Sequence, residues 1–331
     1  MHPPRGAPVR LRRLPGLLQH PQLRLLRLGR TSLTVFLQQL INGLSLGAIY
    51  ALIALGYTMV YGTLQLINFA HGEVYMVGAF AALYIARWTG VVDNPTIPGV
   101  ALVLLGSMIF CAALGMTIER LAYRPLRKST RLNILITAIG VSLLLQNLGL
   151  LLVGPIDTFP TIVPETQWEP MAGLVIRSND LITLGVTLTL MLGLRHIVEK
   201  TQMGRAMRAV SHSRDTAAMM GIPVDRVISF TFALGSVLAA AAAFLVAMDK
   251  HVIKPDMGAM GGLKAFVAAV LGGIGSIPGA VLGGFMLGIS ETLVSGYLAS
   301  TYRDAIAFGI LIVVLLVRPA GLLGRHTVEK V

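Results

Sequence analysis

Apolar residues occur along this chain in long continuous runs rather than in alternation with polar ones. Most runs approach the roughly 20 residues that a helix needs to cross the hydrocarbon core of a bilayer. Strands of a membrane β-barrel would alternate apolar and polar side chains, so the runs predict helices. We therefore expect an all-α, polytopic transmembrane helix bundle. The predicted spans are Phe36–Val60, Leu66–Ala86, Val100–Ile118, Leu132–Val153, Leu181–Leu194, Val227–Met248, Leu263–Leu298 and Ala305–Val317.

Charged residues gather between these runs and predict the topology. Basic residues predominate at 119–131, at 195–226 and in the C-terminal tail, whereas acidic residues predominate at 154–180. Because cytoplasmic loops of membrane proteins are rich in Lys and Arg, we expect the first three segments, including the C-terminus, on the cytoplasmic side. The long run at 263–298 must then enter and leave on one side, as a hairpin of short helices or a re-entrant pair.

The N-terminal segment 1–35 is rich in arginine and contains no acidic residue. We expect it to be a disordered extension, with the folded domain covering 36–331. A cytoplasmic arm and a start codon placed too far upstream both remain open. If the extension is cytoplasmic, three simple spans would place residue 119 outside, against its basic surroundings. Either one of those spans is broken into two pieces, or the extension lies outside.

Composition agrees with a membrane protein. The chain is 55% hydrophobic and only 13% charged, whereas a soluble domain has about a quarter of its residues charged. The net charge of +12 would suggest nucleic acid in a soluble protein, but here it lies in the short segments between spans and is assigned to topology. We expect no nucleic-acid partner. Cys111 is the single cysteine, so neither a disulfide framework nor a cysteine metal cluster is predicted.

A polar string at 62–73 separates the first two apolar runs. The candidate substrate-path residues in it are Gln65, Asn68, His71 and Glu73. Ionisable groups at membrane depth are costly and usually face a cavity or a partner. Irregular backbone at that depth is tolerated where it lines a water-filled path. Two interpretations remain open: a structural elbow whose side chains bind neighbouring helices, and a lining of the transport path.

Glycines repeat in the second half of the 263–298 run. Gly275, Gly279 and Gly283 are spaced by four residues, and small residues at this spacing let helices approach closely in lipid. We expect them to serve helix packing. Pro278 interrupts the helix, which favours the hairpin. A phosphate-binding loop is excluded because no Lys-Ser or Lys-Thr follows the glycines.

The basic segment 203–223 is amphipathic. Its apolar positions include Met207, Val210, Ala217, Met219 and Met220. Its arginines, at other positions, are Arg205, Arg208 and Arg214. Such a helix can lie in a groove of a partner protein, or on a membrane surface that carries anionic lipid. The pattern alone leaves both open.

Catalytic motifs are absent from the sequence. It contains no His-Glu-x-x-His, no Gly-x-Ser-x-Gly and no carboxylate pair in a plausible site, so no enzyme and no metal site is expected. An intramembrane enzyme built on His71 would have only Ser45 or Glu73 as a second group. An ion-coupled secondary transporter is a further alternative, but it would need inverted repeats and a midplane ion site, and the two halves show no clear repeat.

Several stretches resemble a known family, the inner-membrane permease (H-type subunit) of bacterial branched-chain amino acid ABC importers. The resemblance covers Phe36 to Val331. The stretches that carry it are Phe36–Gly47, Tyr50–Gly62, Ile67–Met76, Glu119–Arg127, Lys264–Ala280 and Gly321–Val331.

The resemblance implies roles and partners. Permeases of ABC importers dock on the ATPase through a cytoplasmic Glu-Ala-Ala-x-x-x-Gly loop, and Asp215, Thr216, Ala217 and Gly221 occupy those places here, with Asp for Glu and Thr for Ala. The implied partners are a second related permease subunit, two ABC ATPase subunits that bind ATP, and a periplasmic amino-acid-binding protein. No cofactor is expected on this chain itself. The implied substrates are leucine, isoleucine and valine, with urea or short amides as the alternative.

Overall fold

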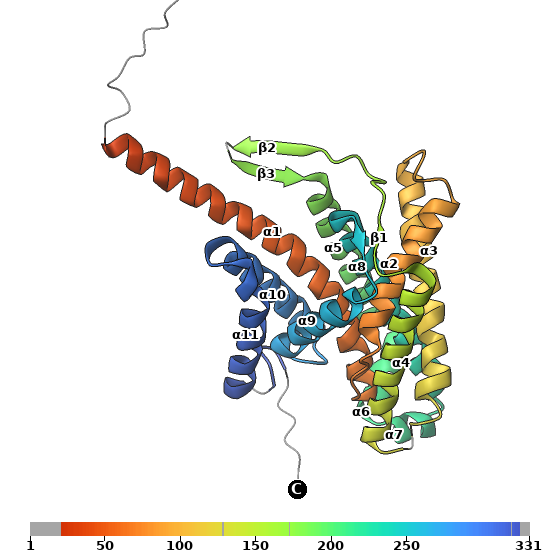
Figure 1. Ribbon diagram of the computed structural model, residues 1–331. Coiled ribbons are helices and arrows are strands. Elements are labelled where there is room, and N and C mark those ends of the chain that lie inside the picture. Colours follow the sequence, from red (N-terminus) through yellow and green to blue (C-terminus); the bar gives the residue numbers. More distant parts are fainter. Residues whose placement is uncertain (1–20, 128, 172, 319, 325–331) are drawn as a thin grey trace, which may run out of the picture.

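The computed structural model describes residues 21–127, 129–171, 173–318 and 320–324. Helices form most of this part, which confirms the all-α bundle (Figure 1). The helices are α1 (Pro21–Leu64), α2 (His71–Trp88), α3 (Ile97–Ile118), α4 (Arg131–Val153), α5 (Ser178–Lys200), α6 (Gln202–His212), α7 (Arg214–Met219), α8 (Val224–Lys250), α9 (Met257–Gly272), α10 (Ile277–Tyr297) and α11 (Arg303–Val317), with short helical turns η1 (Glu119–Tyr123) and η2 (Ser300–Tyr302).

Segments that connect the helices form two antiparallel strand pairs, which the hydrophobic pattern did not predict. The pairs are β1 (Asp157–Thr158) with β4 (Val252–Ile253), and β2 (Gln167–Met171) with β3 (Leu174–Arg177). The second pair lies within the acidic segment 154–180 and extends beyond one end of the bundle, opposite α6 and α7 (Figure 1).

Helices of membrane-spanning length agree with most predicted runs. Among the described residues, seven helices are long and apolar enough to cross a membrane. α2 falls outside this set although it has 18 residues, because it carries His71, Glu73 and Arg87. α9 has only 16 residues. The seven spans are Leu33–Leu64, Ile97–Tyr123, Leu132–Val153, Ser178–Lys200, Val224–Lys250, Ile277–Tyr297 and Ser300–Val317.

Helix α1 begins at Pro21, so the expected boundary at residue 36 is not the start of an element. Residues 1–20 lie outside the described residues. The stretch 21–35, PQLRLLRLGRTSLTV, belongs to this helix and is rich in leucine and arginine, which are good helix formers. Pro21 occupies the first helical position, where its missing N–H costs nothing.

The path of the chain shows at which end of the bundle each of the first three helices begins and ends. α1, α2 and α3 are each one unbroken helix. α1 starts at the end of the bundle that carries β2 and β3, and it finishes at the end that carries α6 and α7 (Figure 1). Residue 119 therefore shares an end with α6 and α7, as its basic surroundings predict. The start of α1 lies at the opposite end of the bundle from residue 119 (Figure 1).

The 263–298 run is a pair of helices, as we predicted from the requirement that the run enter and leave the membrane on one side. α9 ends at Gly272 and α10 begins at Ile277. The Ser276 hydroxyl accepts a hydrogen bond from the Gly279 amide at 3.2 Å and caps α10, and Pro278 lies in the first turn. Amides of Leu322 and Leu323 donate to the carbonyls of Leu271 and Gly272, which satisfies the end of α9.

Glycines on α10 allow its close packing on α9, but only part of the predicted set takes part. A Cβ at Gly279 would overlap the backbone of Gly272, and one at Gly283 would overlap the carbonyl of Ala268. Gly275 is a correction to the expectation: it lies in the connection, where a Cβ would meet nothing within 4 Å. Its φ of +91° explains the glycine there, because few other residues adopt that region.

Helix α8 lies in the core of the bundle, together with α1. Its run Ala239–Ala243 is fully buried, and such small residues let neighbouring helices approach. A Cβ at Gly78 of α2 would lie 2.7 Å from Ala240 Cα. In the most apolar 18-residue stretch of α8, 72% is buried, whereas in the corresponding stretches of α4 and α11 only 11% and 6% are buried. α4 and α11 therefore present apolar side chains outward, as helices that contact lipid do.

Candidate functional site

Helices α6 and α7 form a compact hairpin at one end of the bundle (Figure 1). The Thr201 hydroxyl accepts from the Gly204 amide at 3.1 Å and starts α6, and the Ser213 hydroxyl accepts from the Thr216 amide at 3.2 Å and starts α7. Both are N-caps of the kind that Ser and Thr favour. Gly221 follows α7 with a φ of +78°, which turns the chain toward α8.

The apolar positions of this hairpin divide into two groups. Met207, Val210 and Ala217 are buried against the bundle, whereas Met219 and Met220 are 79% and 78% exposed. Exposed long apolar side chains at the tip of a capped, ordered hairpin suit a protein groove, since methionine adapts its shape to a partner. One face of the hairpin thus packs against the bundle, and the other face is exposed and free to contact a partner.

The polar candidates of the hairpin have separate positions. Arg205, Asp215 and Thr216 are exposed. The Arg208 guanidinium donates to the Val198 carbonyl near the end of α5. Arg214 is half-buried, and its guanidinium donates to the carbonyl of Leu64, the last residue of α1. Arg214 therefore links the hairpin directly to the joint between α1 and α2.

That joint is the polar string, and it is an elbow: residues 65–70 lie outside both helices. Gln65 has a φ of +54° and is exposed. Asn68 is buried, and its Oδ1 accepts from the Tyr123 hydroxyl at 2.6 Å. Tyr123 belongs to η1, so the elbow is attached to the end of α3 as well.

His71 and Glu73 lie beyond the elbow, inside the bundle. Both are 1% exposed. The His71 ring packs edge-on against Tyr57 of α1, with ring centroids 4.6 Å apart. Ser142 of α4 donates to one oxygen of Glu73 at 3.3 Å, while Oε2 has no hydrogen-bond partner.

The four predicted path residues therefore do not converge. Gln65 faces solvent, Asn68 binds η1, and His71 and Glu73 lie between helices. A recess near the elbow has a volume of about 10 Å³, room for one water at most. It is lined by Tyr57, Tyr61, Ile67, Phe266, Ala269 and Ile274, and by none of the four predicted residues.

The structure contains a cluster of ion pairs at η1 that the sequence did not predict. Glu119 is fully buried; its carboxylate accepts from Arg127 and, at 2.5 Å, from the Ser229 hydroxyl of α8. Asp225 in the first turn of α8 accepts from Arg124 and, at 2.5 Å, from Arg127. The basic segment 119–131 thus fastens α3 to α8 besides marking topology. One glutamate among five basic residues was the available signal.

A second buried cluster joins α1, α9, α10 and α11. Glu291 of α10 is 1% exposed. Its carboxylate accepts from Tyr50 at 3.0 Å, from Lys264 at 3.3 Å and from Arg303 at 2.5 Å. Lys264 also pairs with Asp304 at 2.6 Å. The only signal in the sequence was the presence of Lys264 and Glu291 within an apolar run, which is unusual in a membrane helix.

At the end of the bundle opposite α6 and α7, ion pairs join the exposed connections between the helices. Arg87 donates to both carboxylate oxygens of Asp157, at 3.0 and 2.9 Å. These bonds hold the pKa of Asp157 below its ordinary value. His251 lies 2.9 Å from a carboxylate oxygen of Glu165.

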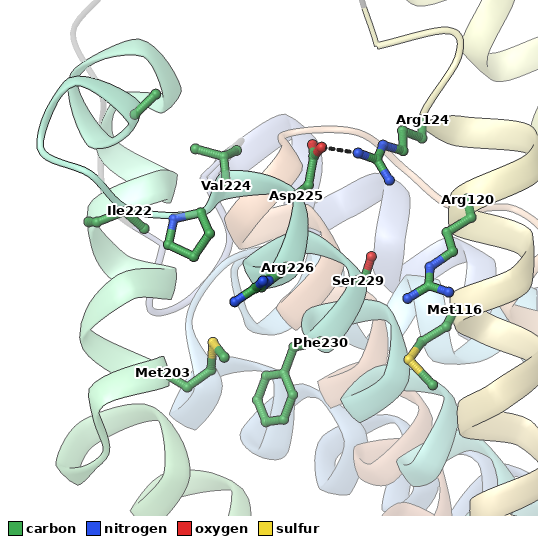
Figure 2. Close-up of a pocket in the computed structure, with 12 residues that line it drawn as sticks. Met116, Arg120, Arg124, Met203, Ile222, Val224, Asp225, Arg226, Ser229 and Phe230 are labelled. Carbon is green, nitrogen blue, oxygen red and sulfur yellow. Dashed lines mark hydrogen bonds and ion pairs between the residues drawn. The ribbon is translucent and has the colours of Figure 1, made fainter.

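A pocket of about 760 Å³ opens beside the first turns of α8 (Figure 2). The end of α3 and η1 form one wall, α6 and the α7–α8 connection another. It is lined by Met116, Arg120, Arg124, Met203, Ala218, Ile222, Pro223, Val224, Asp225, Arg226, Ser229 and Phe230.

Comparison with known proteins identifies the family. The family model for the branched-chain amino acid transport system permease component matches residues 39–315. The high-affinity branched-chain amino acid transport system permease protein LivH of Escherichia coli K12 is 46% identical over 304 residues, which cover 89% of this chain and 98% of that protein. The corresponding protein BraD of Pseudomonas aeruginosa is 45% identical over 301 residues, with the same coverage. The chain belongs to the family of branched-chain amino acid transport permeases.

Proposed function

We propose that this chain is the membrane-spanning permease subunit of an ATP-binding-cassette importer that moves leucine, isoleucine and valine across the bacterial inner membrane. Family membership supports the transport class and the substrates. The end that carries α6 and α7 faces the cytoplasm, in keeping with the basic segments 119–131 and 195–226. ATP binds to two partner ATPase subunits, and a periplasmic binding protein delivers the amino acid.

The observation that carries the coupling proposal is the exposed methionine tip of the α6–α7 hairpin. Met219 and Met220 project from a helix pair that is packed on the bundle through the buried residues Met207, Val210 and Ala217. The tip inserts into a groove on the ATPase surface, as amphipathic helices do in partner grooves. The acidic residue of the docking motif is Asp215, which is exposed on the same short helix.

Movement of the hairpin reaches the end of α1 directly through Arg214, and two further contacts, both made by η1, extend the connection to the elbow and to α8. Arg214 holds the end of α1, Tyr123 holds Asn68 of the elbow, and the carboxylate of Glu119 accepts from Ser229 of α8. α1 and α8 have the most buried windows of the candidate spans, so a shift of their ends reorients the packed core. ATP-driven closure of the ATPases thereby alternates access to the two sides of the membrane.

The transport path lies between this chain and a second, related permease subunit. The recess near the elbow is far too small for an amino acid, and His71 and Glu73 are enclosed by helices of this chain. A path shared by two permeases requires only part of its lining from each. In this arrangement His71 and Glu73 act as internal contacts that move with α2.

Replacing Met219 and Met220 with serine tests the docking proposal. Both side chains are exposed, so the variant should insert and fold normally. We expect loss of co-purifying ATPase subunits and of amino-acid uptake, because the apolar tip supplies the contact. A matched control replaces Leu121, 75% exposed on η1 at the same end, with serine and should keep both. Normal uptake by the double methionine variant would refute docking through this tip.

A further inference from the structure

The pocket beside α8 has a charged rim that takes no part in the proposed contacts between the hairpin, the elbow and α8. Arg120 lies just after α3, and Arg226 lies in the first turn of α8 (Figure 2). Both arginines are exposed, and within the described residues neither forms an ion pair or a side-chain hydrogen bond. Arg124, the third arginine of the pocket, is occupied by Asp225.

The carboxylate in the pocket does not neutralise the free arginines. Asp225 accepts from Arg124 and from Arg127, which lies outside the pocket. Two guanidinium groups therefore remain available to an anion. Arginine suits phosphate in particular, because its planar fork can donate two hydrogen bonds to one phosphate group.

Apolar side chains lie directly beneath this rim. Met116 precedes Arg120 by one turn of α3, and Phe230 follows Arg226 by one turn of α8, so both are one turn deeper in the bundle. Met203 of α6 completes the apolar wall (Figure 2). Arginines at helix ends above apolar side chains reproduce the order of a bilayer, with headgroups above acyl chains.

We propose that this pocket binds an anionic phospholipid of the cytoplasmic leaflet. Its phosphate lies between Arg120 and Arg226, and an acyl chain follows Met116 and Phe230. The proposal rests on the cytoplasmic orientation of this end, not on ATPase docking. An acidic segment of a protein partner is the competing occupant. The lipid is favoured because Met116 and Phe230 lie one turn deeper in the bundle than the two arginines, and because the exposed tip residues Met219 and Met220 are not part of the pocket.

The occupant would connect elements that matter for coupling. Ala218 and Ile222, at the end of α7 and just after it, line the same pocket as the end of α3. A lipid in this place therefore contacts both the coupling hairpin and η1.

Native mass spectrometry of the purified full-length chain tests the proposal. The detergent-solubilised protein is titrated with phosphatidylglycerol and, separately, with phosphatidylcholine of the same chain length. We expect more bound phosphatidylglycerol, and about tenfold weaker binding in the variant R120Q/R226Q, because charge-assisted hydrogen bonds to phosphate are lost. The control R195Q/K200Q removes two exposed charges at the same end, outside the pocket, and should bind as the unaltered protein does.

A second variant guards against a folding artefact. Met116→Trp keeps both arginines but fills the apolar wall, so it should weaken binding of long-chain phosphatidylglycerol and spare a short-chain form. Equal binding of phosphatidylglycerol by R120Q/R226Q and by the unaltered protein would overturn the proposal, as would absence of any preference over phosphatidylcholine or equal competition by inorganic phosphate. R120Q/R226Q protein that keeps the lipid but no longer retains ATPase subunits would assign the pocket to a protein partner instead.

Discussion

At the scale of single residues, buried charges distinguish this bundle from a simple apolar one. Glu119 and Glu291 are each enclosed and each accept from arginine. A carboxylate buried among helices is tolerated when cations and hydroxyls complete its bonds. Removing one partner leaves the others as uncompensated charge, which makes these positions sensitive.

Glu291→Gln should destabilise the protein strongly. Glutamine cannot neutralise Lys264 and Arg303, and breaking a buried pair costs about 3–5 kcal/mol. Asp304→Asn is the matched control, because Asp304 contacts Lys264 but its side chain is 47% exposed. Thermal unfolding in detergent should show a large fall in the midpoint for the first variant and a small one for the second. Equal midpoints would show that the Glu291 cluster contributes little to stability.

The sequence predicted some of the buried polar residues and missed others. The polar string at 62–73 stood out because ionisable groups rarely interrupt apolar runs, and the structure makes it an elbow with buried side chains. Its irregular backbone turns Gln65 away from the other three, which the sequence alone does not reveal. Glu291 was missed because its partner Tyr50 lies 241 positions away in the chain, and sequence spacing carries no information about such a contact.

At the scale of elements, the α6–α7 hairpin and the elbow form one mechanical unit. The guanidinium of Arg214 connects them through the last carbonyl of α1. Local signals in the sequence predicted an amphipathic segment at 203–223. They did not show which methionines face outward, because that depends on how the hairpin lies against the bundle.

Arg214→Gln should separate ATPase docking from transport. The variant keeps the exposed tip at Met219 and Met220, so ATPase subunits should still co-purify. Uptake should fall severely, because the joint between α1 and α2 no longer follows the hairpin. Arg205→Gln, an exposed change on α6, provides the control and should transport normally. Both activities are compared in vesicles that contain the complete importer. Normal uptake by Arg214→Gln would exclude this contact as a coupling step.

Hydrophobic runs predicted the long helices well, and the parity of charges predicted the break between α9 and α10. The start of α1 at Pro21 was missed because arginines made 1–35 look like an extension. The β2–β3 pair was missed because its strands are short and almost wholly outside the core.

At the scale of the whole molecule, the distribution of charged segments between the two ends of the bundle supports the orientation that we propose. Basic segments 119–131 and 195–226 lie at the same end of the bundle as α6 and α7, and the acidic segment 154–180 lies at the other (Figure 1). This distribution matches the positive-inside tendency for the helices of one chain.

Cysteine labelling tests that orientation. Cys111 is the single native cysteine and is buried, so Cys111→Ala gives a suitable background. A cysteine at Thr166, which is exposed on the acidic side, should react with a membrane-impermeant maleimide in intact spheroplasts. A cysteine at Ser129, exposed on the basic side, should react only after the membrane is opened. The reverse pattern would invert the proposed topology.

We infer that this chain works as the membrane subunit of an ATP-driven assembly. Affinity capture of the tagged protein from detergent-solubilised membranes, with mass spectrometry of the co-purifying chains, tests it most directly. We expect recovery of ABC ATPase subunits and a second hydrophobic permease. Recovery of this protein alone, from membranes in which those subunits are expressed, would show that it does not work in such an assembly and would favour a stand-alone transporter.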